Sequence, residues 1–404
     1  MNNAAFITRV GIKNYKSIAA CDVTLHPLTF LVGPNGAGKS NFLDVLRFVT
    51  DALRTSLGHA LRDRGGIKEV RRRSGGHSTH FSIRLDFKLS SGANGHYAFR
   101  IGARSQGGYE VQNEECTLHG SELLTPDAHF TVQGGEVIKT SARVAPAAAS
   151  DRLYLVNASG LAEFRPLYEA LSHMGFYSLN PDRIRDLQAP DAGELLMRDG
   201  GNITSVLGLL KTQHLDAKQQ IEEYLSKVVP GMSGVDVKTV GPKETLEFRQ
   251  KVAGMKDPWR FLAANMSDGT LRVLGILVAL FQSGNGQRVP LVGIEEPEMA
   301  LHPAAAGILL DSLRAASRQT QIVVTSHSPD LLDDDELDID SILSVVSREG
   351  VTLVGPLNEA GRSVLRDHLY TAGELLRLDQ LKPDPAVLDA ATHDPLRLFE
   401  MNKD

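Results

Sequence analysis

Apolar and polar residues alternate along residues 81–140, whereas other segments carry apolar residues at helical spacing. A period of two is typical of strands with one face in water, so residues 81–140 predict an antiparallel sheet. Residues 5–12 and 22–32 also predict strands. The second of these leads directly into a glycine-rich loop, residues 33–40, and then into a helix whose apolar positions share one face.

The rest of the chain predicts a helical portion followed by alternating strands and helices. Residues 158–229 are mostly helical, and a hairpin with its turn at Gly241-Pro242-Lys243 follows. From residue 260 onward, a buried helix (LRVLGILVALF) precedes the apolar runs VPLVGIEE and QIVVTS, which are typical of inner strands of a parallel sheet.

The predicted fold class is α/β, with an added antiparallel β-sheet and an inserted helical lobe. We expect a core from residues 1–56 and 257–356, an antiparallel sheet region over 57–150, a helical lobe with a hairpin over 151–256, and a C-terminal tail over 357–404.

Composition and charge indicate a cytoplasmic protein without a membrane partner. Of the 404 residues, 42% are hydrophobic, and the formal net charge is −6, so no overall charge demands nucleic acid. Cys21 and Cys116 are too few for a disulfide framework. The longest apolar stretch, Val273 to Phe281, is far shorter than the roughly 20 residues that a membrane helix needs.

The glycine-rich loop carries the strongest chemical signal. Gly33, Pro34, Asn35, Gly36, Ala37, Gly38, Lys39 and Ser40 match G-x-x-x-x-G-K-[ST], and Asn41 follows. In this motif, backbone N–H groups and the helix N-terminus bind phosphates, the lysine neutralises them, and the hydroxyl ligates Mg²⁺. The alternative, a glycine turn that happens to precede a helix, does not explain the complete strand–loop–helix order.

A second signal is the pair of acids that ends the apolar strand VPLVGIEE. Buried carboxylates are costly without a partner, and a metal ion with a nucleophilic water supplies one. We therefore assign Glu295 to Mg²⁺ and Glu296 to activation of the attacking water. The alternative is an acidic strand end that caps the next helix.

Two further residues are weaker candidates. Ser267, with Gly269 in the same segment, precedes the buried helix, where it would either cap the helix or face a γ-phosphate bound to a second subunit. His327 ends the apolar run QIVVTS, where α/β sheets place ligand contacts, although a lone histidine is more often structural.

In order, GPNGAGKS, SDGTLR, IEEPEMALHP and TSHSP resemble the ABC-type ATPases of the SMC, RecF and OLD (overcoming lysogenisation defect) group. The opening Ile12-Lys-Asn-Tyr-Lys16-Ser17 resembles their N-terminal element that helps to hold nucleotide. The resemblance implies an ABC-type P-loop ATPase core, ATP and Mg²⁺ as cofactors, and a head-to-tail homodimer that sandwiches ATP. In that dimer Ser267 belongs to the signature loop, and His327 is the switch histidine.

The chain departs from the family pattern in three places. Glu295 stands where many relatives carry Asp, Asp268-Gly269-Thr270 replaces the Gly-Gly-Gln of transporters, and the Q-loop glutamine has only Asn180 and Gln188 as candidates. Too few residues follow Val354 for the Toprim domain of OLD nucleases. The tail resembles stand-alone ATPases that are encoded beside a small effector, so we expect an effector partner, for example a small Toprim-like nuclease, in anti-phage defence.

Basic residues cluster in a glycine-rich segment after the P-loop helix, and they raise DNA as an alternative partner. They are Arg62, Arg64, Lys68, Arg71, Arg72 and Arg73. The same residues are equally compatible with a solvated face or with ion pairs. A DNA-repair or DNA-clamp ATPase like RecF or SMC is thus the main rival function, followed by a transporter subunit and a scaffold that binds ATP without turnover.

The P-loop assignment predicts the effect of removing its lysine. Lys39→Ala should weaken ATP binding at least about tenfold, because an ammonium contact with phosphate contributes on the order of 1.5–3 kcal/mol. Titration calorimetry with ATP measures this change. Unchanged affinity would contradict the assignment of Lys39 to the phosphates.

Overall fold

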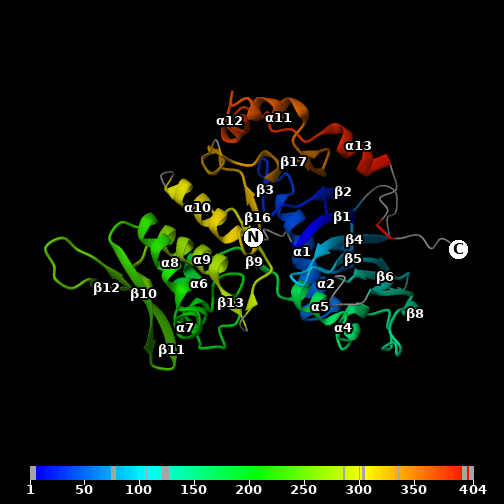
Figure 1. Cartoon of the computed structure of the whole chain (residues 1–404), viewed down its shortest axis with the longest axis horizontal. Coiled ribbons are helices and arrows are strands. Elements are labelled where there is room, and N and C mark those ends of the chain that lie inside the picture. The colour runs from blue at the N-terminus through cyan, green and yellow to red at the C-terminus, as the bar shows by residue number, and fades with distance from the viewer. Residues whose placement is uncertain are drawn as a thin grey trace. The chain divides into compact units, whose positions relative to one another are not determined.

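The computed structural model describes residues 6–73, 79–105, 107–120, 127–284, 287–299, 301–302, 305–334, 336–393 and 398–399 (Figure 1). The chain divides into two units. Unit 1 comprises Met1–Met174 and Asp335–Asp404, and unit 2 comprises Gly175–Asp334.

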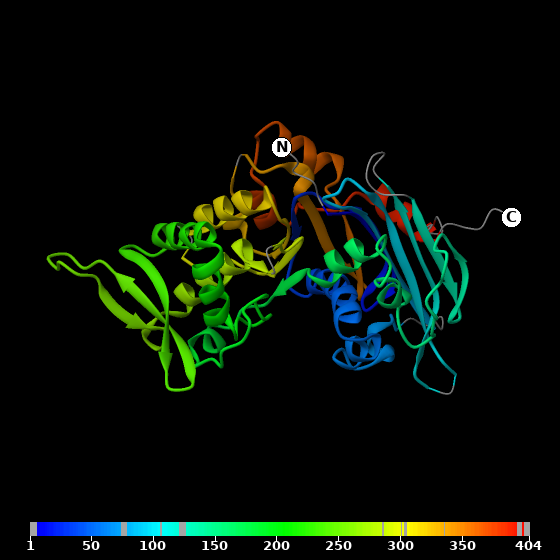
Figure 2. The same cartoon turned by 60° about the horizontal axis from the view of Figure 1, so that its bottom comes forward.

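Unit 1 contains a large mixed sheet whose strands follow one another in the order β8-β7-β6-β5-β4-β1-β2-β18-β17-β3. Figure 2 shows β4 to β8 side by side, and they pair antiparallel as the alternating pattern predicts. The pairs β2–β18 and β3–β17 are parallel. The strands are β1 (Ile7–Tyr15), β2 (Ile18–Thr24), β3 (Leu28–Val32), β4 (His80–Lys88), β5 (Asn94–Ala103), β6 (Tyr109–His119), β7 (Ala128–Gln133), β8 (Glu136–Thr140), β17 (Ile342–Arg348) and β18 (Val351–Pro356).

Helix α1 (Lys39–Arg54) packs its apolar face against this sheet. Phe48 lies edge-on to Tyr15 of β1 and Phe81 of β4, with ring centroids 5.9 and 5.5 Å away, and all three side chains are fully buried. Each such burial contributes roughly 1.5–3 kcal/mol. The other helices of unit 1 are α2 (Leu57–Arg62), α3 (Ile67–Val70), α4 (Tyr154–Ala158), α5 (Arg165–Ser172), η4 (Ile339–Ser341), α11 (Glu359–Arg366), α12 (Ala372–Arg377) and α13 (Pro385–His393).

Unit 2 combines a short parallel sheet, a helical group and an antiparallel sheet. Strand β15 pairs parallel with β9 and β16, and β11 pairs antiparallel with β10 and β12. Helices α8, α9 and α10 contact one another (Figure 1). The elements are β9 (Gly175–Tyr177), α6 (Pro181–Arg185), α7 (Ile203–Gln213), α8 (Leu215–Val228), β10 (Met232–Val240), β11 (Lys243–Gln250), β12 (Trp259–Leu262), η1 (Ala263–Asn265), α9 (Asp268–Phe281), β13 (Ser283–Gly284), β14 (Gln287–Arg288), β15 (Leu291–Glu295), α10 (Ala306–Ser317), β16 (Gln321–Ser326) and η3 (Pro329–Leu331).

The predicted α/β fold class, with its added antiparallel sheet, is confirmed, but two details of the strand prediction are wrong. Residues 22–32 form two strands, because Pro27 lacks an N–H and the Thr29 hydroxyl bonds the backbone N–H of His26 at 2.9 Å, which turns the chain. The short strand β9 lies inside the stretch predicted to be helical. No helix in the described part of the chain is long and apolar enough to cross a membrane.

A buried carboxylate of β6 holds the start of α4. Glu114 accepts hydrogen bonds from the backbone N–H groups of Tyr154 and Leu155 at 2.5 and 2.8 Å and from the Tyr97 hydroxyl at 2.9 Å. No cation is among these partners. Burial therefore outweighs the three hydrogen bonds and raises the pKa of Glu114 to about 7.

This pKa predicts how stability depends on pH. The unfolded carboxyl titrates near 4.5, so between that pH and about 7 the folded state binds more protons, and the free energy of unfolding falls as pH rises. Glu114→Gln removes the charge and keeps one acceptor oxygen, although Tyr154 and Leu155 donate to different carboxylate oxygens. Because the amide does not titrate, the stability of the variant relative to wild type should rise by about 1–3 kcal/mol between pH 4.5 and a pH above 7.

Urea unfolding at a series of pH values measures this difference. The half-buried Glu110 on the same strand provides the control, since Glu110→Gln should leave the pH profile as it is. Parallel profiles for wild type and Glu114→Gln would show that Glu114 does not titrate in this window.

Candidate functional site

The predicted site residues fall into two groups, one in each unit. In unit 1, the glycine loop joins β3 to α1, and Gly36 and Gly38 have φ angles of 77° and 103°, in the left-handed region that favours glycine. A side-chain carbon at Gly33 would lie 1.9 Å from the Val345 carbonyl oxygen, and one at Gly38 would lie 2.0 Å from Thr352 Oγ1. The loop therefore requires glycine at these positions for two different reasons.

Side-chain hydroxyl and amide groups of neighbouring elements support the glycine loop by hydrogen bonds. Thr352 Oγ1 of β18 donates to the Ala37 carbonyl at 2.9 Å and lies 2.7 Å from Ser17 Oγ. Asn41 Nδ2, in the first turn of α1, donates to the same Ser17 hydroxyl at 2.6 Å. Ser17 thus links the N-terminal element to the start of α1, whereas the sequence analysis gave Thr352 no role.

The lysine of the loop points back into it. Lys39 is 5% exposed, and its ammonium group donates to the Gly33 carbonyl at 2.7 Å and the Pro34 carbonyl at 3.1 Å. Pro34, Asn35, Gly36 and Ser40 are exposed. The charge, the exposed loop backbone and the Ser40 hydroxyl at the N-terminus of a long helix are the features that phosphate binding needs.

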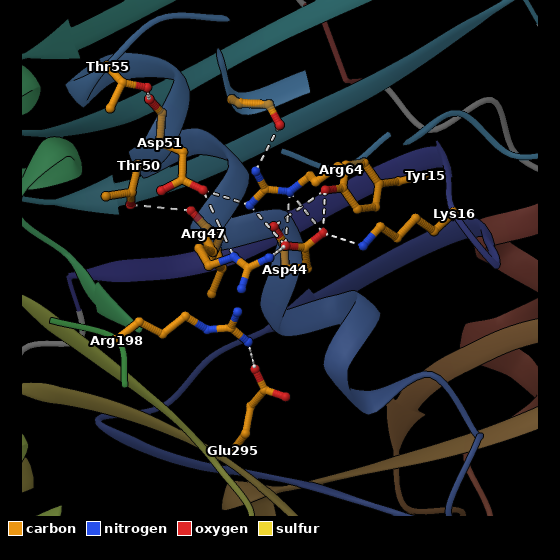
Figure 3. Close-up of polar contacts among 12 residues, drawn as sticks. Tyr15, Lys16, Asp44, Arg47, Thr50, Asp51, Thr55, Arg64, Arg198 and Glu295 are labelled. Carbon is orange, nitrogen blue, oxygen red and sulfur yellow. Dashed lines mark hydrogen bonds and ion pairs between the residues drawn. The ribbon is translucent and has the colours of Figure 1, made fainter. Parts of the chain in front are cut away.

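Lys16 forms an ion pair with an acid of α1 (Figure 3). Its Nζ lies 2.6 Å from Asp44 Oδ2, and Arg47, Arg64 and the Tyr15 hydroxyl also contact this carboxylate. Burial disfavours the charged form of Asp44, but the Arg64 guanidinium, with Arg47 and Lys16, outweighs burial and holds the pKa of Asp44 well below its usual range. Any nucleotide contact by Lys16 stays a prediction.

The same contacts change the interpretation of the basic cluster. The Arg64 side chain is 3% exposed and bridges Asp44 and Asp51 of α1 at 2.9 and 2.8 Å, so it is an internal structural residue rather than a surface for DNA. Arg71 forms a backbone bridge with Tyr15, and Arg72 donates its N–H to the Asn14 carbonyl. Exposed side chains of the cluster are Arg62, Lys68 and Arg73.

In unit 2, the two predicted acids lie at the carboxyl end of β15. Glu295 accepts a hydrogen bond from Arg198 Nη2 at 2.8 Å (Figure 3). Glu296 has a φ angle of 45°, which is unusual for a residue with a side chain, and its N–H donates to the Thr325 carbonyl at 2.9 Å. Strained backbone of this kind costs about 1–3 kcal/mol and is typical of functional sites.

His327 lies beside the acids of this group. Its Nδ1 is 3.3 Å from Glu296 Oε1, so the structure brings these two predicted catalytic residues together. Glu298 Oε1 accepts from the Ser326 hydroxyl at 2.6 Å and the His327 N–H at 3.3 Å. Glu298 thereby positions the strand end that carries His327.

Arg272 of α9 is a residue that the sequence analysis overlooked. Burial lowers its pKa, and the negative charges of Glu296 and Glu298 act in the opposite direction. Its guanidinium therefore lies in the electrostatic field of both acids. Arg272 lies five positions after Ser267. Its proximity to Glu296 and Glu298 depends on the tertiary fold, so no motif spacing in the sequence predicts it.

Ser267 and the Q-loop candidates have local structural roles. Ser267 caps α9, accepting from the Thr270 N–H at 3.3 Å, and Asp268 forms an ion pair with Arg185. Asn180 caps α6. The buried Gln188 amide bonds the carbonyls of Arg183 and Gly200 and both the N–H and hydroxyl of Thr204, which fits a structural role. A nucleotide contact by Ser267 or Gly269 stays a prediction.

The two predicted metal ligands, Ser40 and Glu295, lie in different units. Among the described residues, no group of three or more His, Cys, Asp or Glu side chains could hold a metal by itself. Mg²⁺ in phosphate sites takes one or two protein oxygens and completes its shell with phosphate and water. The Ser40 hydroxyl and the Glu295 carboxylate each offer an oxygen of that type, and a metal contact by either residue stays a prediction.

Comparison with known proteins agrees with the predicted resemblance to ABC-type ATPases. Residues 28–333 match the family described as "AAA domain, putative AbiEii toxin, Type IV TA system". The chain is also similar to the OLD nuclease of Thermus scotoductus, with 24% identity over 340 residues that cover 80% of this chain and 59% of the nuclease. This chain thus spans somewhat more than half of that relative's length.

One solved structure supports the fold, and a second is less similar. An SMC head bound to the C-winged helix domain of ScpA has a TM-score of 0.52 and 14% identity, covering 88% of this chain and 99% of the head. An SMC head from Pyrococcus furiosus with an extended coiled coil, bound to the C-terminal domain of ScpA, has a TM-score of 0.49 and 13% identity, covering 90% and 100%.

The Asp44 cluster predicts a stability difference between two arginines. Arg64→Ala should lower the free energy of unfolding by about 2–3 kcal/mol, because a buried carboxylate loses its most buried cation. Arg73→Ala removes an exposed pair with Glu69 and should cost less than about 0.5 kcal/mol. Chemical unfolding of both variants measures these values. Equal losses would mean that Arg64 does not stabilise unit 1 through Asp44.

Proposed function

This chain belongs to the AAA-domain family that its residues 28–333 match, and from that premise we propose that it hydrolyses ATP and uses the cycle to control a partner effector. The observation that carries the hydrolysis step is the pair formed by Glu296 and His327 at the ends of β15 and β16. A carboxylate on constrained backbone beside an imidazole is suited to accept a proton from water.

The glycine loop of unit 1 binds the nucleotide in this proposal. Its N–H groups and the N-terminus of α1 contact the phosphates, and Lys39 exchanges its carbonyl contacts for phosphate oxygens. Lys16 and Asn41 support the loop from the N-terminal element and from α1. As metal ligands we propose Ser40 and Glu295, and Mg²⁺ bound there would supply charge that offsets the phosphates.

Hydrolysis uses the acids of unit 2. Glu296 takes the proton of the attacking water, and His327 orients that carboxylate and contacts the γ-phosphate. Arg198 donates to the Glu295 carboxylate at 2.8 Å, and a metal contact by Glu295 would have to replace or share this hydrogen bond. Glu298 keeps the backbone N–H of His327 in place, which fixes the ring position.

Dimerisation gives the cycle its two states. Ser267 and Gly269 lie at the N-terminus of α9, whose N–H groups would contact the γ-phosphate bound to a second copy of the chain. The exposed Ser267 is accessible for this contact. Because both copies bind each γ-phosphate, ATP stabilises the closed dimer and hydrolysis releases it.

We propose that the effector is a nuclease, a partner that cleaves phosphodiester bonds, and that it acts in anti-phage defence. Similarity to a nuclease that extends well beyond this chain's matched region supports the pairing of such an ATPase with a nuclease. The family description, which places related AAA domains in toxin–antitoxin systems, supports a role in controlling a toxic partner. A small Toprim-like protein is the partner that we propose.

A DNA clamp of the RecF or SMC type is the alternative function. The exposed Arg62, Lys68 and Arg73 favour it, because cations on a surface loop attract the DNA backbone. The internal role of Arg64 weakens it, since its guanidinium is buried and pairs with Asp44 and Asp51.

Glu296→Gln tests the hydrolysis step. The amide cannot accept the water proton, so phosphate release should fall by roughly 10²–10⁴-fold while ATP affinity is retained, and the ATP-bound dimer should accumulate. Phosphate-release kinetics and light scattering after size exclusion measure the two effects. Glu136→Gln, at an exposed position of β8, is the control. Hydrolysis at the wild-type rate in Glu296→Gln would refute the role of Glu296.

A further inference from the structure

The C-terminal residues Leu398 and Phe399 lie on the sheet of unit 1. Leu398 is 3% exposed, and its carbonyl accepts a hydrogen bond from Arg84 Nη1 of β4 at 3.3 Å. The Phe399 ring lies under the Arg100 guanidinium of β5, with 5.1 Å between the guanidinium carbon and the ring centroid. Two adjacent residues thus contact two neighbouring strands by different chemistry.

The surface that they contact is the face of the sheet opposite the aromatic core. Gly11 of β1 pairs with Arg84, and Arg84 pairs with Ala98 of β5. Because side chains alternate along a strand, these residues share one face with Arg100, while the buried Ile12 and Phe99 lie on the other.

Several charged residues near this surface form ion pairs with one another. Arg9 forms ion pairs with Asp22 and Asp86, and Arg84 pairs with Asp86 at 2.7 Å. The small residues Gly11 and Ala98 lie among these charges, and we call the space beside Gly11 the recess. A side-chain carbon at Gly11 would lie 2.7 Å from Leu398 Cδ2, so the space that glycine leaves open is the space that the leucine uses.

We propose that this recess, formed by Gly11, Arg84, Ala98 and Arg100, is a peptide-binding site for an aliphatic residue followed by an aromatic one. Its occupant is the chain's own Leu398–Phe399. The recess accepts the leucine, Arg84 binds the intervening carbonyl, and Arg100 forms a cation–π contact with the phenylalanine. The site therefore recognises three features of the peptide: the size of the aliphatic side chain, its backbone carbonyl and the aromatic ring that follows.

Binding of Leu398 and Phe399 to the recess restrains the segment that follows α13. Helix α13 contacts β2 and β18, where Leu388 packs near Gly355. Strand β18 also carries Thr352, which braces the glycine loop. When Leu398 and Phe399 occupy the recess, they restrain the segment that contains α13. Helix α13 in turn packs against β18, the strand that supports the glycine loop.

A labelled peptide tests the site in the full chain. The variant Leu398→Ala/Phe399→Ala leaves the recess open, so a fluorescent peptide of residues 394–404 should bind it, as measured by anisotropy. The wild-type chain should bind the same peptide at least roughly tenfold more weakly, because its own tail competes. A peptide carrying both alanines should not bind the open chain.

Variants of the recess locate the binding. In the open chain, Gly11→Val and Arg100→Ala should each weaken peptide binding at least roughly tenfold. Arg104→Ala, at an exposed arginine on the same chain segment, should leave binding unchanged. If Gly11→Val does not fold, the comparison of Arg100 with Arg104 still decides the question.

Three results would overturn the proposal. They are no binding of the peptide to the open chain, equal effects of Arg100→Ala and Arg104→Ala, and a nucleotide-free wild-type dimer that disappears in Leu398→Ala/Phe399→Ala. The last result would assign the recess to the tail of a second copy.

Discussion

A glycine loop has few side chains to hold its shape, so it depends on what packs against its backbone. Here that support is the β17–β18 hairpin, whose Val345 carbonyl and Thr352 side chain occupy the space beside Gly33 and Gly38. Thr352 also bonds the Ala37 carbonyl and meets Ser17, which in turn bonds Asn41 of α1. The predicted phosphate-binding backbone is therefore preorganised by residues more than 300 positions away in sequence.

Two buried carboxylates of unit 1 show how local charge decides the outcome of burial. Asp44 is surrounded by Arg64, Arg47 and Lys16, and these cations hold its pKa low despite burial. In the described part of the chain, Glu114 accepts hydrogen bonds from three uncharged donors, so burial prevails and its pKa rises to about 7. The first residue stays charged and ties α1 to the segment after α2, whereas the second can hold a proton while it anchors α4.

The residues of the candidate site were predictable where the signal is local. Apolar strands lead directly to these residues, which are Gly33 to Ser40, Glu295, Glu296 and His327. An apolar strand that ends in polar residues can be recognised from a few neighbouring positions of the sequence. Arg198, Arg272 and Thr352 were not predictable in this way. Each is an ordinary residue in its own segment, and its role comes from a partner that folding brings near.

At Arg64 and Ser267, the local sequence pattern allows more than one role, and the structure shows which contacts are made. Arg64 looks like one member of a basic run, but a buried guanidinium needs carboxylate partners, and Asp44 and Asp51 supply them from α1. Ser267 suits both a helix cap and a nucleotide contact by its position, and the structure shows that the cap is made. The prediction of one strand over residues 22–32 was wrong because the apolar residues around Pro27 suggested a continuous strand, whereas the chain turns there.

By itself, the sequence determined the α/β class, the antiparallel sheet and the order of the nucleotide-binding motifs, because periodicity and motif spacing are properties of neighbouring residues. Tertiary structure alone decided which charges are buried and paired, which residues brace the glycine loop, and where Leu398 and Phe399 dock. These outcomes depend on contacts between residues far apart in the chain, whose distances and burial no local pattern specifies.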